Sequence, residues 1–160
     1  MMERLRSLLT GADAPSAGQR AAEELRLAAA ALLVEAARMD GEFGAAERAT
    51  IGRLLRERFG LGEAGTAELI DMAEAAAMRS IQIFAFTQAV NNGYSAEERV
   101  AMIEMLWEVA YADGVLHHYE ANLLRRVAGL IHVPDPASGA ARKRVLARLG
   151  LAGEGDRTAR

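Results

Sequence analysis

An internal repeat, which aligns Asp40-Gly41 with Asp113-Gly114, constrains the fold of this chain more than any other feature of its sequence. In this alignment Glu24–Glu47 pairs with Glu97–Glu120, and nine of the paired positions are identical. Both copies contain Ala-x-x-Asp-Gly followed by a Glu, at Ala37–Glu47 and at Ala110–Glu120. Because a repeated sequence folds into repeated units, we expect two similar units related by a pseudo-twofold axis.

Each copy of the repeat has the pattern of two helices joined at its Asp-Gly pair. Apolar residues recur at helical spacing from Leu25 to Met39, and a capping box, Ser-x-x-Glu, precedes the matching helix at Ser95. The other predicted helices are Ala45–Phe59, Glu63–Met78, Ser80–Gly93, His118–Pro134 and Ser138–Leu149. The sequence therefore predicts an all-α fold, a compact bundle of about seven helices with a pseudo-twofold repeat of two helical hairpins.

Composition agrees with this fold and suggests how the chain is divided. Ala and Leu far outnumber Val, Ile and Thr, so residues that favour helices dominate over residues that favour strands. Gly and Pro residues break the pattern between residues 10 and 19. We expect residues 1–19 to form a short N-terminal segment and linker, residues 20–150 the helical domain, and residues 151–160 a disordered tail.

Charge and motifs exclude several classes of function. The formal net charge of -3 gives no basis for binding nucleic acid, whose phosphates would be repelled. The chain has no Cys and no motif of the common nucleotide, metalloprotease or hydrolase sites, so we predict that it is not an enzyme. A helical hydrolase that uses Asp40 and Asp113 with a metal is the most distant alternative.

The N-terminal segment, residues 1–9, bears on localisation. Charged residues interrupt the apolar ones, so neither a secretory signal nor a membrane span is predicted, and we expect a cytoplasmic protein. Met2, Leu5, Leu8 and Leu9 are spaced as on one face of a helix. This face either packs on the helical core or makes a weak contact with the inner membrane.

The repeat and the residues between its copies resemble a known family. They are the two Ala-x-x-Asp-Gly segments, Phe86-Thr87-Gln88, the segment from Tyr94 to Arg99 and the segment from Leu106 to Gly114. From about Leu25 to Val133, these features are similar to the TerB-like family, named for bacterial tellurite resistance, and especially to its stand-alone bacterial branch. The resemblance implies a helical bundle without an established enzyme activity, acidic turns that bind metal, and an association with tellurite and stress-response systems near the bacterial inner membrane.

The acidic residues of the two turns are the candidate metal ligands: Asp40, Glu47, Asp113 and Glu120. Each Asp-Gly pair with its following Glu resembles the second half of an EF-hand loop, but the earlier carboxylates of such a loop are absent. Pooled oxygen ligands would suit Ca²⁺, Mg²⁺ or Mn²⁺ better than Zn²⁺. The alternative is structural, because a Glu at the third position of a helix is a common capping residue.

Two hypotheses about function follow. The first is a non-enzymatic domain that binds a divalent cation, a protein partner or both through its two Asp-Gly turns. The second is a helical interaction or membrane-peripheral scaffold without a metal site, in which a groove between helices receives a partner helix. We further expect Trp107, Phe84, Phe86 and the Met residues to pack in the core. Glu35 and Glu108 are candidate additional metal ligands, but we expect them to be surface residues instead.

Overall fold

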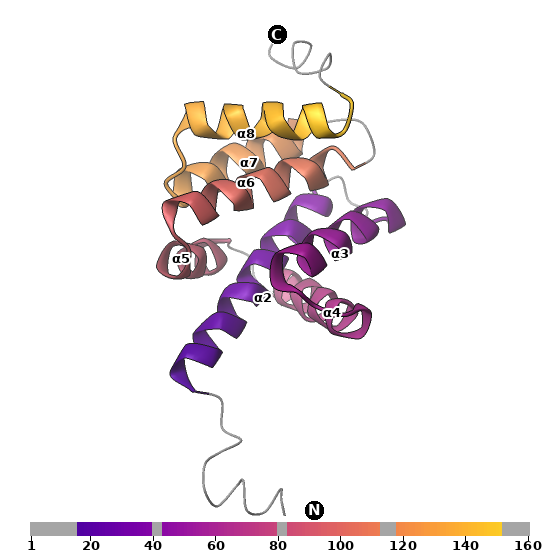
Figure 1. Cartoon of the computed structure of the whole chain (residues 1–160), viewed down its shortest axis with the longest axis vertical. Coiled ribbons are helices and arrows are strands. Elements are labelled where there is room, and N and C mark those ends of the chain that lie inside the picture. Colours follow the sequence, from indigo (N-terminus) through magenta and orange to yellow (C-terminus); the bar gives the residue numbers. More distant parts are fainter. Residues whose placement is uncertain (1–15, 40–42, 80–82, 113–117, 152–160) are drawn as a thin grey trace, which may run out of the picture.

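In the computed structural model, whose described residues are 16–39, 43–79, 83–112 and 118–151, seven helices follow one another (Figure 1). They are α2 (Ala17–Ala37), α3 (Ala45–Phe59), α4 (Glu63–Arg79), α5 (Phe84–Gly93), α6 (Ala96–Ala110), α7 (His118–Leu130) and α8 (Asp135–Arg148). No strand occurs in these ranges. The predicted all-α fold is therefore confirmed, and no described helix is long and apolar enough to cross a membrane.

The helix boundaries follow the sequence repeat. The last residues of α2 and α6 are equivalent in the repeat, and so are the first residues of α3 and α7. The first residue of α8 is one position before the equivalent of the first residue of α4. α4 packs against α2 as α8 packs against α6. Each copy thus extends to three helices, α2–α4 and α6–α8, with α5 between them; the twofold relation of the two copies stays a prediction.

α2 is the central helix of the bundle. It contacts α3, α4, α5, α6 and α7, and in Figure 1 it crosses the middle of the molecule. Every residue from Ala28 to Val34 is at most 3% exposed. A helix buried on all sides needs apolar residues in every direction, and its four consecutive Ala side chains let neighbouring helices approach closely.

The ends of several helices show why they begin and stop where they do. The predicted capping box is confirmed, because the Glu98 backbone N–H donates to Ser95 Oγ at 3.2 Å and the Ser95 N–H donates to Glu98 Oε1 at 3.0 Å. A second capping box joins Ser16 and Gln19 at the start of α2. α2 therefore begins within the segment that the sequence suggested as a linker.

Gly93, the last residue of α5, is important for the packing of α5 on α2. α5 ends at Gly93, as the sequence predicted, but with Tyr94 in an extended conformation as the C-cap. A Cβ atom on Gly93 would lie 2.7 Å from Leu25 Cδ2 on α2. The glycine therefore permits the close approach of α5 to α2.

Part of the predicted core is on the surface. Trp107 is buried as expected, but Phe84 is 57% exposed, Met72 50% and Met78 68%. α4 buries only the face with Leu69, Ala73 and Ala77, since it packs on α2 and α3 from one side. Met72 and Met78 lie on its outer positions, and Phe84 is the first residue of α5.

Candidate functional site

The four predicted metal ligands fall into two groups. Asp40 and Asp113 lie outside the described residues. Glu47 and Glu120 are the third residues of α3 and α7, the position of a capping glutamate. A carboxylate in the first turn of a helix is stabilised by the helix dipole, so both glutamates have a structural role whether or not a cation binds.

The surroundings of these two glutamates differ. One carboxylate oxygen of Glu47 lies 2.7 Å from the point where a Cβ of Gly44, the N-cap of α3, would be, so this side chain folds back over the start of its helix. Glu120 is only 5% exposed. Among the residues with described side chains, no three His, Asp or Glu residues gather as a metal site.

One buried carboxylate, on α6 and shortly before the second Asp-Gly pair in the sequence, is a residue that the sequence predicted on the surface. Glu108 is 7% exposed, and its Oε1 accepts a hydrogen bond from Arg53 Nη2 of α3 at 2.6 Å. Arg148 Nη2 of α8 lies 3.7 Å from its other oxygen. The surface prediction for Glu108 is therefore wrong, because α3 and α8 both cover this side of α6 and each supplies a counter-charge.

These contacts belong to a chain of alternating charges across three helices. Arg53 also pairs with Glu57 on α3, while Arg148 and Arg144 on α8 both pair with Glu104 on α6. A small pocket of about 290 Å³ lies beside Arg53, Glu108 and Tyr111. The charged groups beside this pocket form ion pairs with one another. The arrangement therefore joins α3, α6 and α8 without presenting an unpaired charge to a ligand.

Glu35, the counterpart of Glu108 in the first copy, has no such partner. It is partly buried on α2 and forms no ion pair within 4 Å with a described residue. Burial raises the pKa of its carboxyl group, and the nearby charge of Arg38 opposes this shift. The equivalent glutamates of the two copies therefore differ: Glu108 is paired with two arginines, whereas Glu35 has no ion-pair partner among the described residues.

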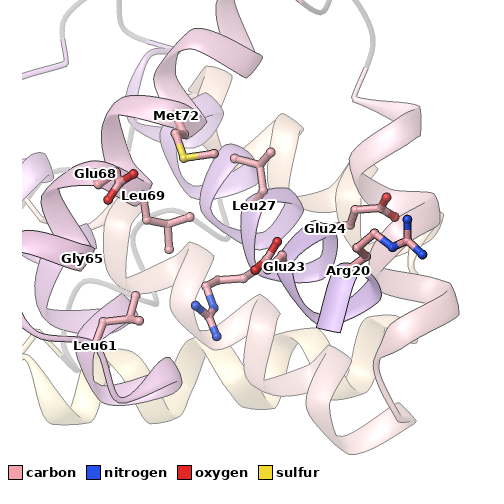
Figure 2. Close-up of a pocket in the computed structure, with 10 residues that line it drawn as sticks. Arg20, Glu23, Glu24, Leu27, Leu61, Gly65, Glu68, Leu69 and Met72 are labelled. Carbon is pink, nitrogen blue, oxygen red and sulfur yellow. The ribbon is translucent and has the colours of Figure 1, made fainter. Parts of the chain in front are cut away.

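Another cavity, of about 560 Å³, is an open groove between the first half of α2 and the first half of α4 (Figure 2). We call it the α2–α4 groove. Its lining residues are Arg20, Glu23, Glu24, Arg26 and Leu27 of α2, Leu61 before α4, and Gly65, Glu68, Leu69 and Met72 of α4. Its volume is within the range of about 300–1,000 Å³ that is usual for ligand sites.

The α2–α4 groove has an apolar floor and charged walls. Leu27 and Met72 point toward one another across it in Figure 2, with Leu69 and Leu61 along the α4 side. Glu23 and Glu24 lie on the α2 wall and Glu68 on the α4 wall. None of these three carboxylates has an ion-pair partner within 4 Å among the described residues, whereas Glu57, Glu98, Glu104 and Glu108 all do.

Two basic residues also line the groove. The Arg26 guanidinium lies over the Phe59 ring, 5.5 Å from its centroid, and Arg20 is at the outer end of the α2 wall. Met72 is half exposed at the floor, and a Cβ on Gly65 would meet nothing within 4 Å. The groove is therefore wide enough to take additional side chains, and its unpaired charge is mainly acidic.

The sequence contained one signal for this groove. α6 begins at Ala96, whose counterpart in the first copy is Glu23, yet α2 begins more than a turn earlier, at Ala17. Residues 17–22 thus extend the central helix beyond the repeat, and all of them, with Glu23 and Glu24, are exposed. A Ser-x-x-Gln capping box at Ser16 could have revealed the extension before the structure did.

Comparison with known proteins gives one match. The family model described as tellurite resistance protein TerB matches residues 26–143, which is most of the chain. Residues 1–25, with Arg20, Glu23 and Glu24 of the α2 wall, lie outside the matched range. No curated protein and no solved structure matches the chain.

Proposed function

The chain belongs to the TerB family, and from that premise we propose that it is a non-enzymatic helical module that binds a partner protein in the α2–α4 groove. The occupant that we propose is an amphipathic helix with basic residues beside its apolar face. We further propose that it works in the cytoplasm, in a tellurite or stress-response context. The observation that carries the binding proposal is the apolar floor of the groove between unpaired carboxylates on both walls.

The chemistry of the groove supports this occupant. Helices bind in grooves by burying apolar side chains at helical spacing, which Leu27, Leu69 and Met72 can accommodate. Exposed Met side chains adapt to different apolar surfaces, since they are unbranched and flexible. Lys or Arg residues on the bound helix would pair with Glu23 and Glu68, which would fix its orientation and favour fast association.

A site-specific cross-linker distinguishes the groove from the rest of α4. A photoreactive diazirine residue would replace Met72, which lines the groove, or Met78, which is at least as accessible on the same helix but outside it. We expect Met72 to capture one protein in cells, through a helical segment rich in Lys or Arg, and Met78 to capture none. Equal capture at both positions, or no capture at Met72, would contradict the proposal.

A pair of glycine substitutions supplies the matched control. Gly65 and Gly129 are both exposed helical glycines with open space at the Cβ position, but only Gly65 lines the groove. We expect Gly65→Leu to block the Met72 cross-link and Gly129→Leu to leave it intact. Both variants should remain folded, because Leu favours helix over Gly by roughly 0.5–1 kcal/mol.

Cation binding at the two Asp-Gly turns is a second candidate function. It is supported by the identical placement of Glu47 and Glu120 at the third position of the following helix, together with the burial of Glu120. A cation that binds the folded form would raise the Tm by mass action. We would titrate Ca²⁺, Mg²⁺, Mn²⁺ and Zn²⁺ against the wild type and against an Asp40→Asn, Asp113→Asn double variant.

The two proteins should respond differently if a cation binds at the turns. We expect Ca²⁺, Mg²⁺ or Mn²⁺ to raise the Tm of the wild type and to leave that of the double variant unchanged. Equal shifts in both proteins, or no shift in the wild type, would reject the site at Asp40, Glu47, Asp113 and Glu120.

A further inference from the structure

We propose that residues 1–9 of this chain occupy the α2–α4 groove and so compete with the partner helix. This inference rests on the proposed function, since it assigns a second occupant to the same helix-binding groove. Residues 1–9 lie outside the described residues, and the chain enters α2 at the end of the groove where Arg20 and Glu23 lie. α8, the last helix within the described residues, is at the opposite end of the molecule from this entry (Figure 1).

The apolar residues of this segment match the floor of the groove. Met2, Leu5, Leu8 and Leu9 share one face when the segment is placed on a helix. The floor opposite consists of Leu27, Leu61, Leu69 and Met72. Packing the two faces together would remove from water an apolar face of residues 1–9 and the half-exposed side chain of Met72.

The charges of the segment match the walls of the groove. On a helix centred on Leu5, Arg4 and Arg6 lie about 100° to either side of the apolar face, and Glu3 lies behind it. Each arginine would therefore face one wall, where Glu23 and Glu68 have no ion-pair partner among the described residues. Glu3 would point to solvent, away from the carboxylates of both walls. Arg20 and Arg26 also line the groove on the α2 side, so the pairing is with Glu23 and Glu68 rather than with the whole wall.

The covalent connection is long enough for this placement. The stretch of chain from Leu9 to Ser16 reaches at most roughly 25 Å when extended. Residues 2–9 would form a helix of about 12 Å, and the α2 wall from Arg20 to Leu27 is about 10 Å long. The segment can therefore fold back along α2 without strain, in either direction, and its tethering gives it a high effective concentration at the groove.

Cross-linking from Met72 in the purified full-length chain tests the inference. We expect the photoreactive residue at position 72 to cross-link to residues 2–9 of the same molecule, with a yield independent of protein concentration. Leu5→Asp with Leu8→Asp should lower this yield roughly tenfold or more, because two carboxylates would have to enter an apolar floor. Glu3→Gln is the matched control on the opposite face and should leave the yield unchanged.

Three results would overturn the inference. The first is no cross-link to residues 2–9, or one that survives Leu5→Asp with Leu8→Asp. The second is cross-linking between isotopically labelled and unlabelled copies, which would assign the groove to a second molecule. The third is loss of the cross-link on adding vesicles of phosphatidylglycerol and phosphatidylcholine, together with sedimentation of the wild type but not of Leu5→Asp, Leu8→Asp, which would assign the segment to a membrane surface.

The inference and the proposed function fail in different ways. In cells, Leu5→Asp with Leu8→Asp should increase capture of the partner at Met72, since the competitor has been removed. Partner capture without an internal cross-link to residues 2–9 refutes the inference alone. An internal cross-link without partner capture in either variant refutes the proposed function alone and leaves residues 1–9 as the occupant of the groove.

Discussion

At the scale of single residues, α3 and α7 are both followed by a residue with left-handed backbone, but the residue differs between the two copies of the repeat. The residue that follows α3 is Gly60, with φ of 65°, and His132, shortly after the end of α7, has φ of 59°. Left-handed backbone costs a non-glycine residue roughly 1–2 kcal/mol. The exit of α7 is therefore strained, while the Val133 N–H still donates to the Ala128 carbonyl at 2.9 Å, as in a Schellman motif.

Replacing His132 with Gly should stabilise the protein. The side chain of His132 is exposed, so its loss removes no core packing, and we expect the free energy of unfolding to rise by about 0.5–1 kcal/mol. Urea denaturation monitored by circular dichroism measures the change. The reciprocal substitution Gly60→Ala, at a site with open space around the Cβ, should lower stability; a fall in stability for His132→Gly would show that its strain is compensated elsewhere.

Glu35 makes a second prediction at this scale, about pH. Because burial raises its pKa above the ordinary value of 4.5, the folded state holds this proton more tightly than the unfolded state. The contribution of Glu35 to stability therefore falls as the pH rises through the interval above 4.5. We expect Glu35→Gln to be more stable than the wild type at pH 7 and to lose this advantage near pH 4, in urea denaturation at both pH values.

At the scale of helices, the same capping motif should contribute differently to stability at the start of α6 and at the start of α2. The Ser95–Glu98 box begins α6, most of whose residues from Met102 onward are buried. The Ser16–Gln19 box begins the extension of α2, where residues 16–24 are all exposed. Fraying of α6 that passes its first turn would expose core residues, whereas fraying of the first two turns of α2 would only loosen one wall of the groove.

Removing the two caps should therefore have unequal effects. We expect Ser95→Ala to lower the free energy of unfolding by about 1 kcal/mol, and Ser16→Ala to lower it by clearly less. Hydrogen bonding to the Ser95 backbone and to Arg58 lowers the pKa of Glu98, so its part of the box is lost as the pH falls below 4.5. Thermal denaturation of both variants at neutral pH is the measurement, and equal losses would contradict this account.

At the scale of the whole molecule, charged side chains hold together helices that come from different copies of the repeat. Arg53 of α3 and Arg148 of α8 meet at Glu108 of α6, so one buried carboxylate connects the two three-helix units. The stacked rings of Trp107 and Tyr111 add to the same contact, with Arg142 of α8 over the Trp107 ring at 5.2 Å. Ion pairs and ring contacts thus join the helices on this side of the bundle, in contrast to the open α2–α4 groove.

Glu108→Gln tests how much that connection contributes. We expect a loss of about 1–2 kcal/mol, below the usual cost of breaking a fully buried pair, because the Arg53 side chain is 43% exposed and water can screen it. Glu57→Gln, at a carboxylate that is 64% exposed, should change stability by less than about 0.5 kcal/mol. Chemical denaturation of the two variants gives the comparison, and similar losses would contradict a special role for Glu108.

The family match and the helical fold agree with what the sequence predicted. The spacing of apolar residues and the capping motifs are local properties of the chain. The bounds of α3 were therefore predicted correctly, and those of α4 were predicted correctly except that Arg79 is added at its end. The start of α8 was predicted late, at Ser138, because Asp135 and Pro136 were not recognised as its first turn. The candidate ligands Glu47 and Glu120 also occupy the helix positions that their spacing from the Asp-Gly pairs implied.

The sequence by itself determined the helices, the repeat and the family, because spacing along one chain encodes them. Only the tertiary structure decided which side chains are covered: it buried Glu108 under α3 and α8 and left Phe84 and Met72 exposed. It also decided where the groove lies, since two walls from α2 and α4 meet only after the chain has folded. Burial depends on neighbours distant in sequence, and no local pattern contains that information.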